Sequence, residues 1–452
     1  MALHDPISVA ALAPTLEKLL SRAKHHGATS ADAVATHGRS LAVVVRGGEL
    51  EDVDNSEGRD IGLRVMVGQR QACVSSSDIS DSSIDQLAER AVAMAKLAPE
   101  DPYCGLAEQS QLDTHNVDLQ LYDDTPITPA ALKARALEVE AAALAVKGVQ
   151  QAEGANASHA SSAIHFMTSH GFSQGWKSSR HGLSVSAIAE KDGAMERDYD
   201  HDGRRWFEDL KTPQDIGRIA GERTVKRLGS KQMESGSMPV IFDQRVSGSL
   251  VAAMVGAITG PSVARGVSFL KEKMGETLFS SNIQIIDDPL MPRGHGSRPY
   301  DGEGIVPVTR HLIKDGALQT WLLNCASAKQ LGLVTTGHAT RSIGSPPGVS
   351  ATNTYLAAGI KTPQELTSHV ENGLWITEMF GPSLNSNTGD YSVGVAGFKI
   401  ENGQKAYPVS EITIAGNLLE MYKTLIPAND LIFDGSTVAP TLLTEGLTVA
   451  GS

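Results

Sequence analysis

The first hundred residues pass from a helical hydrophobic pattern to an alternating one and back. Apolar residues at helical intervals predict a helix over 15–26, which Gly27 ends. From 33 to 77 the apolar positions fall in short β-type runs, such as LAVVVR and LRVMV. Helical spacing returns over 82–96. The pattern therefore predicts a helix, several strands and a second helix.

The same order of elements follows once more. A Thr-Pro pair opens each of two further helices, since a hydroxyl can cap the first turn and Pro fits its start. One helix begins at Thr128 and ends near Gly148, and the other begins at Thr212 and ends near Gly229. Between them, 151–205 alternates small, polar and apolar residues as strands do. The repeated order indicates two α+β units in tandem and is compatible with a duplication, although the two segments share no convincing identity.

The remaining chain is rich in strands. Helical segments are expected around Ala252 and Phe269. Asp315-Gly316 and Asn402-Gly403 each separate two apolar runs, and such dipeptides are the strongest short signals for a two-residue hairpin. We therefore expect an α+β protein whose C-terminal part is dominated by sheet.

The best domain boundary is SGSM, just before the buried-strand pattern MPVIFD at Met238. A chain of 452 residues exceeds the length at which a single core usually stops growing. We expect three parts: an N-terminal α+β subdomain over 1–125, a second over 126–234, and a strand-rich C-terminal domain over 235–452.

Composition excludes several classes of function. A formal net charge of −13 argues against a nucleic-acid groove, which needs clustered Lys and Arg. Three cysteines (Cys73, Cys104 and Cys325) are too few for a disulfide framework and fit a reducing compartment. No signal peptide and no run of about 20 apolar residues is recognisable. We expect a soluble cytoplasmic protein with no nucleic-acid or membrane partner.

Motifs for catalysis are weak when the residues are considered alone. The string GFSQG over 171–175 matches a nucleophile elbow, but strand-like residues follow it where that motif needs a helix. No phosphate-binding loop occurs. His295, His311 and His338 lack a short helical spacing, so surface positions on loops or strands are the simpler interpretation.

The loop NSNTGDYS over 385–392 is the remaining candidate for binding. Its polar groups could hydrogen-bond the backbone of an extended peptide at a sheet edge. The candidates are Asn385, Asn387, Thr388, Asp390, Tyr391 and Ser392. The alternative is a turn whose side chains satisfy their own backbone.

Several ordered segments together resemble the TldD/PmbA family, and specifically its PmbA (TldE) branch. The resemblance runs from about Ala31 to Gly451 and depends on many motifs in order. These are TSHGF from Thr168, MERDYD from Met195, SFLKEKMG from Ser268, DDP from Asp287, DGEG from Asp301, TGH from Thr336, NSNTGDYS from Asn385 and EITIAGNL from Glu411. The resemblance implies an α+β fold of TldD/PmbA type.

The resemblance also places a zinc site on the helix around Ala252. In the TldD branch this helix reads like LLHEAVGH, where the two His and the Glu serve as ligands and general base. Aligned with LVAAMVGA here, those positions are Ala252, Ala253 and Ala257. The family's third ligand is a C-terminal cysteine, but the last cysteine of this chain is Cys325. The resemblance therefore implies no metal and no catalytic residue in this chain.

The function implied by the resemblance is that of a non-catalytic subunit. A TldD-type partner would hold the zinc, form a heterodimer with this chain and hydrolyse unfolded peptides that both subunits enclose; alone, this chain could form a homodimer. Two alternatives stay open. One is a self-sufficient metallopeptidase that uses His295 or His338 beside Asp301. The other is a non-enzymatic regulator of the gyrase-modulator type, which acts through a protein partner.

Overall fold

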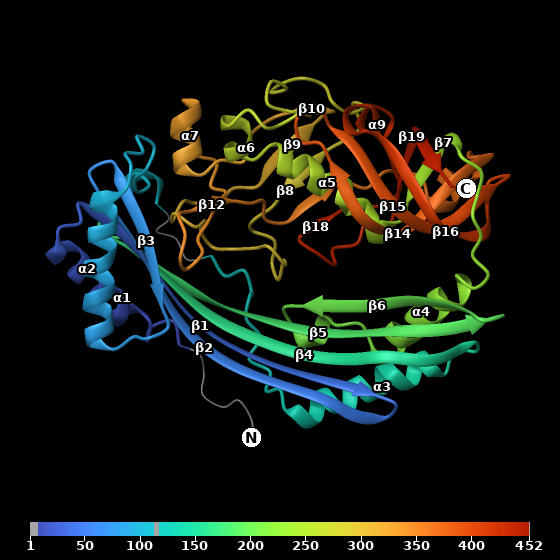
Figure 1. Cartoon of the computed structure of the whole chain (residues 1–452), viewed down its shortest axis with the longest axis horizontal. Helices are drawn as coiled ribbons and strands as arrows, with labels where there is room; N and C mark the ends of the chain where they lie inside the picture. Colours follow the sequence, from blue (N-terminus) through green and yellow to red (C-terminus); the bar gives the residue numbers. More distant parts are fainter. Residues whose placement is uncertain (1–7, 113–116, 452) are drawn as a thin grey trace.

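The computed structural model describes residues 8–112 and 117–451, and its N-terminal half is built on one curved six-stranded sheet (Figure 1). The strand order is β3-β2-β1-β4-β5-β6, and all neighbours are antiparallel. The strands are β1 (Ser30–Arg46), β2 (Glu49–Val67), β3 (Arg70–Ser76), β4 (Val149–Thr168), β5 (Ser173–Lys191) and β6 (Ala194–Arg204). The segments 1–125 and 126–234 thus supply three strands each to one sheet, and their division into two subdomains stays a prediction.

Four helices cover one face of this sheet. They are α1 (Ala13–His26), α2 (Asp81–Leu97), α3 (Pro129–Leu144) and α4 (Pro213–Lys226). The side chains of Thr128 and Thr212 accept hydrogen bonds from first-turn amides of α3 and α4, as the Thr-Pro pairs predict. Gly27 ends α1 in the left-handed conformation, with φ of 104°. The order helix, three strands, helix occurs twice, which confirms the α+β units.

The C-terminal half contains a barrel-like sheet and a smaller mixed sheet. The first has the order β16-β15-β14-β7-β19-β17, and an additional β16–β19 pairing closes it. Its strands are β7 (Gly236–Phe242), β14 (Asn372–Leu384), β15 (Asp390–Glu401), β16 (Gln404–Asn417), β17 (Ile426–Pro427) and β19 (Leu442–Ala450). The second contains β8 (Ile285–Asp287), β9 (Arg310–Lys314), β10 (Ala317–Leu318), β13 (Thr354–Leu356) and β18 (Thr437–Val438), while β11 (Ala339–Thr340) pairs with β12 (Gly348–Val349). The helices are α5 (Gln244–Ala257), α6 (Gly260–Ala264), α7 (Cys325–Leu331), α8 (Pro363–Ser368) and α9 (Leu418–Thr424).

Both predicted hairpins are confirmed. Asp315 and Gly316 have φ of 51° and 79°, and Asn402 and Gly403 have 51° and 76°. Positive φ at both central residues is the signature of the type I′ turn that matches the twist of the flanking strands. They connect β9 to β10 and β15 to β16.

The helix expected around Phe269 is wrong. The chain there consists of turns, although the side chains of Phe269 and Leu270 are buried. Ser268 accepts the amide of Leu270 and donates its hydroxyl to the carbonyl of Ala257. Such side-chain bonds offer the backbone an alternative to the helix. The apolar spacing therefore reflects burial of irregular chain.

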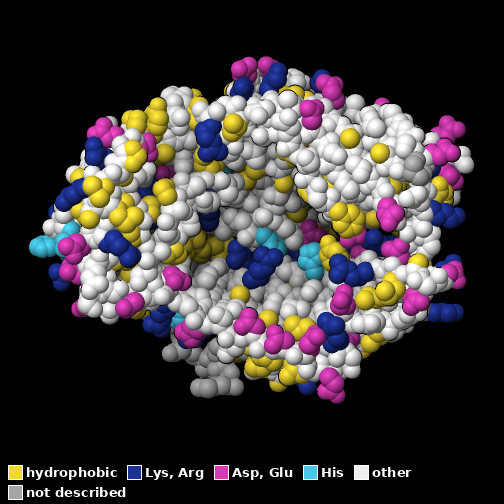
Figure 2. Space-filling view, in the orientation of Figure 1, with side chains coloured by type: hydrophobic (Ala, Val, Ile, Leu, Met, Phe, Trp, Pro, Cys, Tyr) yellow, Lys and Arg dark blue, Asp and Glu magenta, His cyan; other side chains and the backbone are white. Residues whose placement is uncertain are grey.

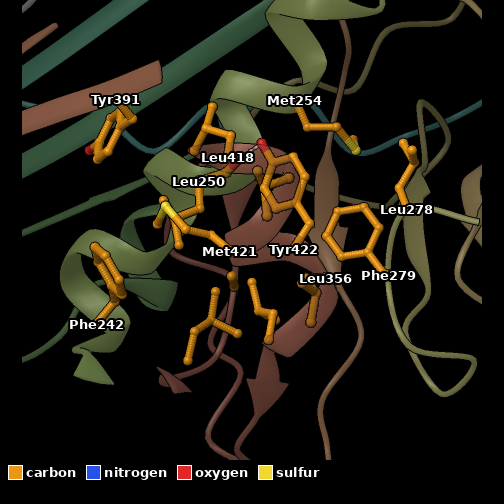
Figure 3. Packing of buried hydrophobic residues seen from close by; sticks show 14 of the residues in the cluster. Phe242, Leu250, Met254, Leu278, Phe279, Leu356, Tyr391, Leu418, Met421 and Tyr422 are labelled. Atoms are coloured by element: carbon orange, nitrogen blue, oxygen red, sulfur yellow. Dashed lines mark hydrogen bonds between the residues drawn. The ribbon is translucent and has the colours of Figure 1, made fainter. Parts of the chain in front are cut away.

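The core of the C-terminal half gathers around helix α5 (Figure 3). Leu250 of α5 lies beside Leu418, Met421 and Tyr422 of α9, and Met254 of α5 points toward Leu278 and Phe279. The Tyr422 hydroxyl donates to the carbonyl of Leu250 at 3.1 Å, which satisfies its polar atom inside the core. Helix α5 is thereby fixed in orientation, and its opposite side faces outward.

The two halves are joined by a buried polar and aromatic contact. Asp32 of β1 accepts Nε of Arg64 at 2.6 Å and Nε of Arg341, from the C-terminal half, at 3.0 Å. Tyr300 packs against Phe172 and Trp176, with ring centroids 5.1 and 4.9 Å apart. A second contact pairs Arg227 with Glu378 and Asp198 with Arg245. Elsewhere the halves enclose a hollow, within which Figure 2 shows Lys or Arg and His side chains.

Candidate functional site

Helix α5 holds the three positions at which the sequence places a lost zinc site. Ala252 is exposed, Ala253 is half-buried and Ala257 is buried. Ser249 and Gly256 are also exposed, so the exposed residues of α5 are all small. Methyl groups have no donor atom, and a catalytic zinc needs about three protein ligands. The residues present on α5 therefore do not fit a zinc ion.

The loop 385–392 lies at the tip of the hairpin between β14 and β15. Its polar groups bond largely to one another: the Asn385 side chain accepts the amide of Asn387, and the Thr388 hydroxyl donates to Asp390 at 2.6 Å. Asn417 donates to both the Thr388 carbonyl and Asp390. Of the other candidates, Tyr391 is buried and Ser392 is half-buried. The geometry matches a self-satisfied turn, and peptide binding here stays a prediction.

The alternative site would need His295 or His338 beside Asp301; His295 lies among arginines instead, and the other two residues have other partners. Nε2 of His338 lies 3.2 Å from Asp287, and Nδ1 lies 2.8 Å from the Thr336 hydroxyl. Asp301 accepts the backbone amides of Glu303, Ile305 and Ala339. Among the residues the structure describes, no group of three or more His, Cys, Asp or Glu side chains could hold a metal ion. The structure therefore does not favour this site.

A groove that the sequence analysis missed lies on the helix-free face of the sheet. It has a volume of about 400 Å³ and is formed by β4, β5 and β6. Small polar residues form much of its floor, and a Cβ added to Gly182 would lie 2.6 Å from the Ser158 hydroxyl. We call it the sheet groove; it is lined by Gly154, Asn156, Ser158, Arg180, Gly182, Leu183, Ser184, Val185, Ser186, Tyr199, His201, Asp202 and Gly203.

The surroundings of the sheet groove are cationic. Burial lowers the pKa of His295 to about 4, and the guanidinium groups of Arg180, Arg204 and Arg205 act in the same direction. Arg180 lies in β5, Arg204 ends β6 and Arg205 follows it, whereas His295 belongs to a loop of the C-terminal half. The fold therefore concentrates positive charge beside the groove in a chain whose net charge is −13.

Comparison with known proteins identifies the family. Models of the PmbA/TldA metallopeptidase match residues 31–95 as domain 1, 122–228 as the central domain and 235–451 as the C-terminal domain. Metalloprotease PmbA of Escherichia coli O157:H7 is 35% identical, covering 96% of this chain and 94% of that protein. A PmbA homolog of Haemophilus influenzae is 33% identical, covering 94% of this chain and 92% of its own length. The chain belongs to the PmbA/TldD metallopeptidase family.

Solved structures share the fold of this PmbA/TldD family member. A putative modulator of DNA gyrase from Bacteroides thetaiotaomicron superposes with a TM-score of 0.90 at 24% identity, covering 97% of this chain and 99% of its own. TldE from Thermococcus kodakarensis gives 0.85 at 20% identity, covering 97% of this chain and all of its own. The α+β fold with a strand-rich C-terminal domain is thus confirmed.

Buried carboxyl groups of this family member predict a pH-dependent stability. Asp301 and Glu303 are 1% and 3% exposed, and Glu303 accepts the amide of Cys325 at 2.8 Å. Burial, and then the charge of Asp301, raise the pKa of Glu303 from 4.5 to about 7. The folded chain therefore binds a proton on Glu303 more tightly than the unfolded chain does. This proton stabilises the fold at low pH, and the stabilisation is lost as the pH rises from about 4.5 to about 7.

We expect Glu303→Gln to reduce this loss of stability. Urea unfolding at about pH 5 and about pH 8 should show a smaller difference in the free energy of unfolding for the variant than for the parent. Glu108→Gln serves as the control because Glu108 is exposed. This variant should show the same difference in unfolding free energy between the two pH values as the parent. An unchanged difference in Glu303→Gln would assign the pH dependence to other groups.

Proposed function

We propose that this chain is a TldE-type, non-catalytic subunit of a cytoplasmic heterodimeric zinc peptidase. It helps to bind and enclose an unfolded peptide, which a TldD-type partner hydrolyses. The observation that carries the proposal is the set of methyl side chains at Ala252, Ala253 and Ala257. Zinc-dependent hydrolysis needs imidazole or carboxylate ligands and a base that activates water. The zinc is therefore assigned to the partner.

A free strand edge supports the peptide-binding role. Strand β14 pairs with β7 only from Leu374 to Ile376, whereas its pairing with β15 continues to Leu384. Among the described residues no strand pairs with the other edge beyond Ile376. Main-chain groups on such an edge can bind an extended peptide as an added strand. Met379 of this segment also contacts Ser249 of α5, so the edge lies beside the helix.

The proposed location is the cytoplasm. No helix in the described part of the chain is long and apolar enough to cross a membrane. The gyrase-modulator description belongs to a structure that is 24% identical, so it supports the fold alone. Among the contacts of residues 8–112 and 117–451, none specifically favours a gyrase partner over a peptidase subunit.

Co-elution and elemental analysis test the assembly. Purified alone, the chain is expected to carry far less than one zinc per chain, as a monomer or a homodimer. Mixed with the TldD-type chain of the same genome, it should elute at the mass of a heterodimer that carries about one zinc. One zinc per chain in the isolated protein, with peptidase activity that a chelator removes, would contradict the proposal. Separate elution of the two chains would contradict the heterodimer.

A further inference from the structure

We propose that the sheet groove binds acidic segments of an extended peptide and that Arg180 contacts their carboxylates. This inference rests on the proposed peptide-enclosing function and adds a preference for the charge of the substrate. It concerns the helix-free face of the N-terminal sheet, far in sequence from α5 and from the loop 385–392.

The floor of the groove leaves room for a main chain to approach. Along β5, Gly182, Ser184 and Ser186 face the groove, whereas Leu183 and Val185 belong to the core under helices α3 and α4. A Cβ at Gly203 would lie 3.1 Å from a guanidinium nitrogen of Arg180. Glycine at 203 therefore keeps open the space that this guanidinium occupies. Small polar side chains dominate this floor, which suits an extended chain of varied sequence.

The positive charge in and beside the groove is not neutralised within the chain. Arg180 is exposed, and the described residues place no carboxylate or other hydrogen-bond partner on its guanidinium. Arg205 is half-buried and donates only to carbonyls, those of Ser179, Gly294 and His295. Arg204 alone faces a carboxylate, with its Nε 2.9 Å from Asp202. Arg180 thus remains for an anionic ligand, since Arg binds carboxylates in a bidentate manner, and Arg205 only adds positive charge nearby.

A peptide fits this charge better than a single-stranded nucleic acid. Nucleic-acid grooves add aromatic platforms on which bases stack. The two aromatic rings among the residues that line the groove, Tyr199 and His201, stack on each other, and Arg245 lies 4.8 Å from the Tyr199 centroid. The net charge of −13 would also repel a polyanion outside the groove. Carboxylates dispersed along a peptide avoid most of this repulsion.

Fluorescence anisotropy with matched peptides tests the preference. Three labelled Gly-Ser peptides differ only in carrying Glu, Gln or Lys at the same positions. Each is titrated with the full-length chain, first without and then with its TldD-type partner. The Glu peptide should bind most tightly, and Arg180→Gln should weaken it about fivefold at low salt, with a smaller loss at high salt. Arg218→Gln on α4 removes another exposed guanidinium, from the helix-covered side, and should leave the affinity unchanged.

The outcomes separate this inference from the proposed function. Equal affinity for Glu and Gln peptides, or equal losses in Arg180→Gln and Arg218→Gln, would overturn the inference. Tighter binding of a single-stranded oligonucleotide than of the Glu peptide would also overturn it. In each of these cases partner-dependent cleavage would still support the proposed function. Loss of both peptide binding and partner-dependent cleavage would contradict the proposed function itself.

Discussion

Hydrolysis of an unfolded peptide is expected only when this chain is mixed with a TldD-type chain, and this chain alone should give only the background rate. The reason is chemical: Ala252, Ala253 and Ala257 supply neither a ligand nor a base, so no water is activated on α5. The rate in the mixture should rise with added chain and saturate at equal amounts of the two. Cleavage of a quenched fluorescent peptide measures this directly.

Variants on the two subunits show which one carries the chemistry. Removing a zinc-binding His from the partner should lower cleavage to background, whereas Ala252→Gln in this chain should keep the rate within about twofold, because exposed substitutions rarely cost more than about 0.5 kcal/mol. A partner that cleaves equally well without this chain would refute the subunit role. Chelator-sensitive cleavage by this chain alone would instead support the hypothesis of a self-sufficient metallopeptidase.

Local signals in the sequence predicted the elements whose causes are local. Thr128 and Thr212 cap helices because the hydroxyl and the first-turn amide lie within four residues. Asn402-Gly403 fixes its hairpin because both residues accept positive φ. The helix predicted around Phe269 was wrong for the opposite reason, since Phe269 is buried by tertiary packing against residues such as Gly389. Apolar spacing alone cannot distinguish these cases.

The sheet groove could not be located from the sequence because its parts are brought together by long-range pairing. Arg180 and His295 lie more than a hundred positions apart, and only the docking of the C-terminal half places them together. One signal was present in GLSVSAIAE. There, small polar residues alternate with apolar ones, which indicates a strand with one polar face. The pattern predicts that face, but not what lies above it.

The positions on α5 were predicted from the family resemblance, and the structure adds their environment. Ala252 and Ala253 reach the outer side of the helix, while Ala257 is 8% exposed. Ala252 could carry a larger side chain without disturbing the core, whereas Ala253 packs partly against the core and Ala257 lies within it. Restoring a zinc site would therefore need a third ligand from elsewhere in the chain as well as substitutions at these three positions.

The contact between the halves should depend strongly on Asp32. This carboxylate is fully buried and bridges Arg64 of the sheet to Arg341 of the C-terminal half. Asp32→Ala would leave two buried guanidinium groups without their shared partner, and breaking a buried pair in this way typically costs about 3–5 kcal/mol. Glu303 also interacts with Arg64 and would compensate in part. We expect a loss of about 3 kcal/mol in the free energy of unfolding, measured by urea denaturation.

A surface ion pair provides the matched control. Glu276 accepts Lys273 at 2.8 Å, but their side chains are 53% and 36% exposed, so Glu276→Ala should cost less than about 1 kcal/mol. Because Asp32 bridges the halves, its loss should also separate their unfolding into two transitions. The combined variant Asp32→Leu with Arg341→Leu should recover part of the stability, since removing both partners leaves fewer buried charges unpaired. Equal costs for Asp32→Ala and Glu276→Ala would show that the buried bridge does not hold the halves together.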